Sequence, residues 1–180
     1  MDKNYTQKLE EVIKQMLTPL KKIPFNLVIE GLSGCKIIPF DKKDKKDVVL
    51  LEKIIKAANL AGSELNKTGI LRTRPNEVGN DIEPFVKRAL NSVGYKADTP
   101  KTNSGGKKST GYPDIEFTDE FERVNYLECK TFNIENISTT QRSFYLSPSD
   151  EFKITKNAHH FVLSFEIYVE KSVGKDKLFK

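Results

Sequence analysis

The chain has 180 residues, a formal net charge of +5 and a pI of about 9.0. This length suits one domain with a substantial hydrophobic core and is short for two, and the modest positive charge favours a polyanionic partner only weakly. No apolar run is long enough to span a bilayer, and no apolar signal region follows the first residues. The two cysteines are too few for a disulfide framework or a cysteine-rich zinc site. We therefore expect a single-domain cytoplasmic enzyme or binding protein without a membrane partner.

The first 70 residues are predicted to be mainly helical. Apolar residues at helical spacing predict one amphipathic helix over residues 4–20 and a second over about 46–61. Between them, the short apolar runs 25–29 and 36–40 indicate either strands or buried loop. The charged run 41–47 is most simply a solvated turn.

A third helix is predicted over about residues 80–93, and it is the best defined of the set. Asn80 is a good N-cap, Pro84 falls within the first turn, and Gly94 stands where a left-handed C-terminal cap belongs. One face carries the apolar stripe Ile82, Phe85, Val86, Ala89, Leu90 and Val93. The following segment, 95–111, has four lysines against the single acid Asp98 and predicts an exposed, basic, mobile loop; the lysines are Lys96, Lys101, Lys107 and Lys108.

The remainder of the chain is predicted to form a sheet. Two strands, 114–118 and 124–131, flank a turn at 119–123. A further half-buried strand is expected over 160–169, where Phe161, Leu163, Phe165, Ile167 and Val169 alternate with polar or mixed residues. Helices followed by a hairpin and a strand indicate a mixed α/β fold.

The predicted hairpin brings two carboxylates together. Counting back along both strands from the turn gives three opposed pairs: Thr118 with Val124, Glu116 with Tyr126, and Asp114 with Glu128. Opposed Cβ atoms lie roughly 5 Å apart, and side chains alternate between the two faces of a strand. Glu128 and Lys130 therefore share a face, and Cys129 points to the other side as a core-facing small hydrophobe.

Two carboxylates beside one lysine indicate a metal site. Like charges opposed across a sheet repel each other, and a divalent cation removes that cost. Mg²⁺ typically takes one or two carboxylates together with phosphate oxygens and waters. Lys130 could then orient the nucleophile, stabilise charge on the phosphoryl oxygens or accept a proton, and the sequence leaves these roles open. Glu116 could join the metal shell, but a solvated edge residue is its more common role.

These residues resemble a known motif. Pro113-Asp114, thirteen intervening residues and Glu128-Cys129-Lys130 look like the signature of the PD-(D/E)xK nuclease superfamily. The preceding helix and the loop into Gly111-Tyr112 are similar to that family's N-terminal core. Within it, the stretch 139–145 and the strand after it are most like type II restriction endonucleases. The resemblance spans about residues 79–169.

The resemblance implies a fold and a set of site residues. It implies a single domain, 1–180, in which a helical part, 1–70, precedes a restriction-endonuclease-like core, 76–170, with a central mixed β-sheet flanked by helices. Asp114, Glu128 and the backbone carbonyl of Cys129 would bind the metal, and Lys130 would be the catalytic lysine. Glu83 is the match for an acidic residue that such enzymes often bring from the preceding helix, although Glu77 is a rival. Asn80 and Glu83 are also close to a capping box, which would give Glu83 a purely structural role.

The implied activity is Mg²⁺-dependent, sequence-specific cleavage of double-stranded DNA with 5′-phosphate products, by a homodimer if the target is a palindrome. We expect the loop lysines Lys101, Lys107 and Lys108 to contact DNA phosphates. For base reading, which needs side chains that reach groove edges, the candidates are Gln141 and Arg142, followed by Arg72, Arg74 and Asn76. The two histidines, His159 and His160, are more often structural in such a position.

Two other functions remain open on the sequence. A junction resolvase or repair nuclease of the same fold would use the same metal site without strict sequence choice. A DNA-binding protein without catalysis would bind in a salt-sensitive manner, indifferent to the loss of Asp114 or to a chelator.

Overall fold

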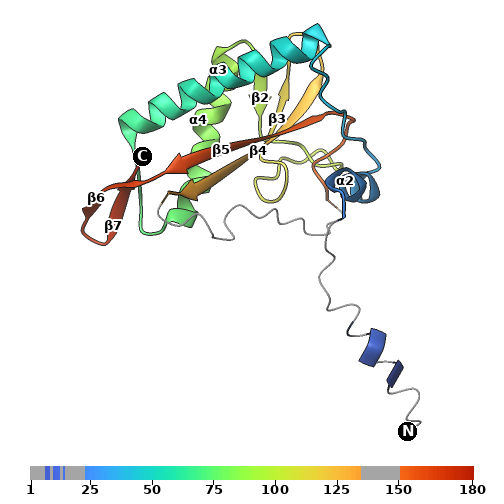
Figure 1. The fold of residues 1–180 in the computed structure, drawn as a ribbon, viewed down its shortest axis with the longest axis horizontal. Coiled ribbons are helices and arrows are strands. Elements are labelled where there is room, and N and C mark those ends of the chain that lie inside the picture. The colour runs from blue at the N-terminus through green and yellow to red at the C-terminus, as the bar shows by residue number, and fades with distance from the viewer. Residues whose placement is uncertain (1–6, 9, 13, 15–22, 135–150) are drawn as a thin grey trace.

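The computed structural model describes residues 7, 8, 10–12, 14, 23–134 and 151–180 (Figure 1). Most of the helix predicted over residues 4–20 lies outside this range. The described elements are α2 (Phe25–Ser33), α3 (Lys45–Thr68), β1 (Ile70–Arg72), the 3₁₀ turn η1 (Pro75–Glu77), α4 (Val78–Ser92), β2 (Lys96–Asp98), β3 (Ile115–Thr118), β4 (Val124–Asn133), β5 (His159–Ile167), β6 (Val169–Val173) and β7 (Asp176–Phe179).

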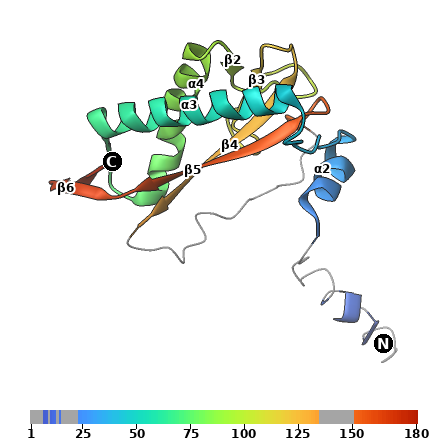
Figure 2. The ribbon, with the colours of Figure 1, turned by 45° about the horizontal axis from the view of Figure 1, so that its top comes forward.

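A mixed four-stranded sheet with the order β2-β3-β4-β5 forms the centre of the fold. The pairs β2–β3 and β3–β4 are antiparallel, and β4–β5 is parallel. Helices α3 and α4 pack on one face around a core that includes Ile54, Leu90 and Leu127. Helix α2 packs on the other face, where Ile29 contacts a smaller cluster with Tyr126 and Ala158 (Figures 1 and 2). The predicted mixed α/β fold, with a central sheet flanked by helices in the restriction-endonuclease-like manner, is confirmed.

The alternating strand predicted over residues 160–169 is confirmed in its main part as β5. Ile167 is buried in the main core, and Phe161, Leu163, Phe165 and Val169 pack against it, as their spacing predicted. The regular pairing ends at Ile167, however, and Val169 begins a second, three-stranded sheet with the order β1-β7-β6. There β1, which follows α3, pairs with β7 near the C-terminus, with Ile70 opposite Phe179. This second sheet was not predicted from the sequence.

Three local predictions were wrong. Residues 25–29, expected as strand or buried loop, form the first turns of α2, which ends where Gly34 adopts a left-handed φ of 70°. Helix α3 continues past residue 61 to Thr68 because Leu65 extends its buried stripe. The basic segment 95–111 is not all loop, since its residues Lys96–Asp98 form β2 and pair with β3.

Helix α4 begins two residues earlier than predicted. Its first residue is Val78, so Asn80 lies inside the helix and is not its N-cap. The helix also tolerates Pro84 in its interior, although proline lacks the N–H that would bond to the preceding turn. Glu83 therefore does not belong to a capping box with Asn80. The Glu83 side chain is therefore not needed as a helix cap.

A buried ion network fixes the hairpin turn between β3 and β4 to the start of α3. The Arg123 guanidinium donates to Asp47 Oδ1 at 2.7 Å and to Asp119 Oδ2 at 2.8 Å. His159 Nε2 lies 3.2 Å from Asp47 Oδ1, and the Asp41 N–H donates to Asp47 Oδ2 at 2.9 Å. Burial alone would raise the pKa of Asp47, but the Asp41 hydrogen bond and the Arg123 guanidinium hold it below its usual value. His159 therefore has a structural role.

We predict that Asp47→Ala lowers the free energy of unfolding by about 3 kcal/mol, because it removes the buried carboxylate that accepts from Arg123 and from the Asp41 N–H and leaves Asp119 as the remaining carboxylate partner of Arg123. Urea unfolding measures the loss. Glu30→Ala is the control, since the Glu30 carboxylate lies 3.9 Å from Lys36 in an exposed pair that should contribute little. Equal unfolding midpoints for the two variants would contradict the prediction.

Candidate active site

The register of the hairpin places Asp114 beside Glu128. Thr118 lies opposite Val124 and Glu116 opposite Tyr126, as counting from the turn predicted. Asp114 directly precedes β3, and its Oδ2 accepts a hydrogen bond from the Cys129 N–H at 2.8 Å. The Asp114 carboxylate is thus held at the edge of β4, next to the position of Glu128.

Glu128 and Lys130 form an ion pair on β4. The Lys130 Nζ lies 2.7 Å from Glu128 Oε1, and the two side chains are 19% and 8% exposed. The second carboxylate oxygen, Glu128 Oε2, is buried and accepts no hydrogen bond from any residue that the structure describes. A buried carboxylate oxygen without a donor is costly and indicates that another group binds there.

Glu83 projects from α4 into the same place. It lines an open cavity of about 180 Å³ together with Asp114, Glu128 and Lys130. The rival residue, Glu77, accepts a hydrogen bond from the Arg74 N–H at 3.2 Å, so its carboxylate caps the 3₁₀ turn, and it is not among the residues that line this cavity. The geometry therefore selects Glu83 as the helical acid and assigns Glu77 the capping role.

Burial raises the pKa values of all three acids, and repulsion from Asp114 adds to the shift for Glu128 and Glu83. Burial is the main cause for Asp114, where the Cys129 N–H opposes it. Burial and then the Asp114 charge raise the pKa of Glu128. The same two causes raise the pKa of Glu83 to about 7. Converging carboxylates with raised pKa values are typical of a site that binds a cation.

Cys129 faces the core from the same strand. Its side chain is 6% exposed, and burial raises the pKa of its thiol well above the usual value. A nucleophilic role is therefore not supported, as predicted. Because the N–H and C=O of a strand residue point to the same side, the Cys129 carbonyl is directed toward the edge where Asp114 accepts its N–H bond. The carbonyl, and not the thiol, is the candidate ligand.

Lys153 was not among the site residues predicted from the sequence. Its side chain is 2% exposed, although lysine is almost never buried unless it is paired. Burial lowers the pKa of Lys153, and the charges of Asp114, Glu128 and Glu83 oppose that shift. The one signal in the sequence is that Lys153 lies between Phe152 and Ile154, and that pattern also fits an ordinary half-buried strand or loop.

Three of the candidate DNA-binding residues have other partners in this structure. Lys107 pairs with Asp98, and the Lys108 Nζ donates to the Glu151 carbonyl at 3.3 Å. Arg72 makes two hydrogen bonds of 2.6 Å to the Asp81 carboxylate. Lys101 is exposed, as is Arg74. Gln141 and Arg142 lie outside the described residues, and the side chain of Asn76 is not described.

The two remaining chemical candidates lie away from the cavity. Glu116 is not among its lining residues, and burial raises the pKa of Glu116 while the charges of Lys156 and Lys101 oppose this. His160 Nδ1 forms a hydrogen bond of 2.6 Å with the Tyr112 hydroxyl, and burial lowers the pKa of His160 to about 4. His160 is therefore neutral at physiological pH and packs as part of the aromatic cluster next to α2.

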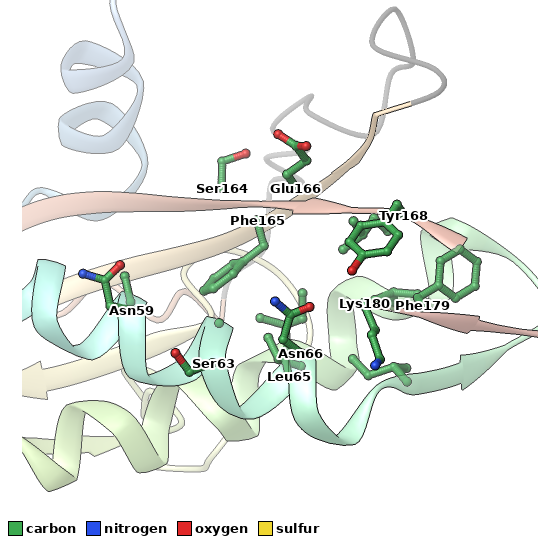
Figure 3. Close-up of a pocket in the computed structure, with 16 residues that line it drawn as sticks. Asn59, Ser63, Leu65, Asn66, Ser164, Phe165, Glu166, Tyr168, Phe179 and Lys180 are labelled. Atoms are coloured by element: carbon green, nitrogen blue, oxygen red, sulfur yellow. The ribbon is translucent and has the colours of Figure 1, made fainter. Parts of the chain in front are cut away.

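A larger pocket of about 480 Å³ lies elsewhere, between α3, β5 and the C-terminal strand. Figure 3 shows Phe165 pointing from β5 toward α3, whereas Ser164 and Glu166 point to the opposite side. None of the predicted catalytic or metal-binding residues lines this pocket. The predicted catalytic and metal-binding residues line the smaller cavity instead.

The mixed sheet, with two acids and a lysine on its central hairpin and a third acid from α4, defines the class as a PD-(D/E)xK nuclease. Comparison with known proteins agrees with this. The model of a protein family described as "Type II restriction enzyme MjaV family" matches residues 19–177. The curated protein "Type II restriction enzyme MjaV" of Methanocaldococcus jannaschii is 45% identical over 190 aligned positions, which cover 97% of this chain and 81% of that protein.

The chain belongs to the type II restriction enzyme MjaV family. The resemblance to type II restriction endonucleases, which the sequence motif first indicated, is thereby confirmed, and with it the assignment as a restriction-endonuclease-like deoxyribonuclease. No solved structure gives a significant match. No helix among the described residues is long and apolar enough to cross a membrane.

We predict that Glu83→Gln stabilises the metal-free protein at high pH and not at low pH. The pKa of Glu83 is raised from 4.5 to about 7 in the folded protein, so the wild type loses stability as the pH rises from about 4.5 through 7, where the folded chain must give up a proton that the unfolded chain has already lost. Glutamine cannot ionise. Thermal unfolding with EDTA should give similar midpoints at pH 4.5 and a higher midpoint for the variant at pH 8.

Glu77→Gln is the matched control, because it removes a carboxylate from the same region outside the cavity. A pH-independent difference between Glu83→Gln and the wild type would contradict the raised pKa of Glu83.

Proposed function

We propose that this protein is a Mg²⁺-dependent type II restriction endonuclease that hydrolyses phosphodiester bonds in double-stranded DNA at a specific sequence. One observation carries the proposal: in a chain of this family, the hairpin and α4 bring Asp114, Glu128, Glu83 and Lys130 into one cavity. The family resemblance implies a 5′-phosphate product. Two-fold symmetry of a palindromic target favours a homodimer.

The donor set fits a magnesium ion. Its side chains offer carboxylate oxygens, which Mg²⁺ prefers over nitrogen or sulfur. Glu128 Oε2 is the buried oxygen without a donor, and Asp114 is held at the same edge. Among the described residues, no three His, Cys, Asp or Glu side chains form a ready-made metal cage. We therefore infer that Asp114, Glu128 and the Cys129 carbonyl supply part of the coordination, and that waters and phosphate oxygens complete it, as is usual for Mg²⁺.

The protein's own groups would position the reacting atoms. When bound, the ion lowers the pKa of a water and stabilises charge on the leaving oxygen. Lys130, which pairs with Glu128 in the metal-free state, would be released to place its ammonium group beside the attacking water and the scissile phosphate. Glu83 would join from α4, either as a ligand through water or as a proton acceptor.

We predict that Asp114→Ala and Lys130→Ala each reduce plasmid cleavage by roughly a hundredfold or more, because each removes a charge that acts in the transition state. EDTA should abolish cleavage by the wild type. Glu52→Ala and Lys56→Ala, which change exposed residues of α3, are the matched controls and should cleave normally.

Cleavage that survives both Asp114→Ala and Lys130→Ala would disprove the assignment of the site. The same digest, made on a long DNA, separates the related functions: discrete, reproducible fragments support sequence-specific restriction, whereas smearing or nicking at branched structures favours a repair or junction nuclease. Salt-sensitive binding without any cleavage would leave only a DNA-binding protein.

We also propose that the loop lysines Lys101, Lys107 and Lys108 contact DNA phosphates next to the cavity. Replacing all three by alanine should weaken DNA binding in EDTA and reduce the slope of log affinity against log salt by up to about 3, roughly 0.9 for each lost contact. Fluorescence anisotropy at several salt concentrations measures this. The control triple variant is Lys171→Ala, Lys175→Ala and Lys177→Ala, which removes the same charge from the exposed β6–β7 hairpin. Equal slopes for the two variants would contradict the proposal.

A further inference from the structure

Lys153 is a buried cation that no contact in the described structure explains. Its side chain is 2% exposed, and its Nζ has no hydrogen-bond acceptor among the described residues. Burying an ammonium group without a partner costs several kcal/mol, and a lysine in a merely structural position normally extends its flexible stem to water. Lys153 forms no ion pair among those described that would hold two elements together. Its placement therefore needs a functional explanation.

Lys153 lies in a cavity next to the segment that carries Asp114. The charges of Asp114, Glu128 and Glu83 act on it. It does not line the cavity that these acids share with Lys130, but a neighbouring cavity of about 240 Å³ whose wall includes Gly111 and Tyr112. Those residues lead directly into Pro113-Asp114. Lys153 and Lys130 therefore come from different segments of the chain and line two cavities on either side of the approach to Asp114.

The formal charges show what a second lysine contributes. Three ionised carboxylates and Lys130 carry two net negative charges, and Lys153 reduces this to one. A divalent cation and one phosphodiester together add one positive charge, so the loaded site is neutral with Lys153 and negative without it. Charge in a partly dehydrated site acts strongly on transition-state groups.

On the basis of the proposed function, we propose that Lys153 is a second active-site lysine, whose buried charge offsets the acid cluster and stabilises the negative charge that develops on the scissile phosphodiester. Lys153 would raise the rate of cleavage at the expense of metal affinity, because the same positive charge repels the metal ion. A residue with only a structural role would not separate these two effects.

The test compares Lys153→Met, which keeps the length of the side chain and removes its charge, with Lys153→Arg, which keeps the charge. Calorimetric titration with Mg²⁺ in the absence of DNA measures metal affinity, and single-turnover plasmid cleavage at saturating Mg²⁺ measures the rate. We expect Lys153→Met to bind Mg²⁺ severalfold more tightly and to cleave roughly tenfold or more slowly. In EDTA its thermal midpoint should be equal to or above that of the wild type. Lys153→Arg should stay closer to the wild type in both measurements.

Lys156→Met is the control, because Lys156 is an exposed lysine in the same segment. Cleavage by Lys153→Met within about twofold of the wild-type rate, or Mg²⁺ affinity that is unchanged or weaker, would overturn the proposal. Should Lys153→Met fail to fold, Lys153→Gln gives the same comparison. An active Asp114→Ala variant would instead overturn the proposed function, whereas an inactive Asp114→Ala beside a fully active Lys153→Met would overturn this inference alone.

Discussion

The hydrogen bond from the Cys129 N–H to the Asp114 carboxylate sets the geometry on which the site depends. Asp114 lies one residue before β3, and its carboxylate takes the place of a backbone acceptor at the edge of β4. The antiparallel register from Thr118 to Ile115 leads to this position, and a slip by one residue would turn Glu128 and Lys130 to the opposite face. The ion network of Arg123 fixes the turn at the far end of the same hairpin. Two distant constraints thus hold one register.

The hairpin was predictable because its information is local. A turn at 119–123 and simple alternation give every opposed pair, and the motif then identifies the chemistry. The interior stripe of α4 was predictable for the same reason. Its start was not, because Asn80 and Pro84 imitate an N-terminus, whereas α4 continues directly from the 3₁₀ turn, which Glu77 caps by accepting from the Arg74 N–H. The run 25–29 was ambiguous because a short apolar segment has no distinctive period.

Long-range placement explains the other failures. Lys153 lies close to the hairpin because the parallel pairing of β4 with β5, in which Asn125 lies opposite His159, brings the segment before β5 there. The small second sheet joins Ile70 to Phe179 across more than half of the chain. Neither contact leaves a signal in the neighbouring sequence. Parallel pairing and crossover connections depend on the whole fold, so the residues that they add to a site remain hidden until the structure is known.

The site is electrostatically costly in the absence of its ligands. Three carboxylates have raised pKa values, Glu128 Oε2 lacks a donor, and the Lys153 Nζ lacks an acceptor among the described residues. These groups cannot all be satisfied by each other, since pairing Lys130 with Glu128 leaves one oxygen of that carboxylate unbonded. On the proposed function, a metal ion would satisfy the oxygens and a phosphodiester would satisfy the lysines. Each ligand would relieve a cost that the other leaves, so their binding should be positively coupled through charge alone. The cost of gathering these charges would then favour the state in which metal and DNA are bound together.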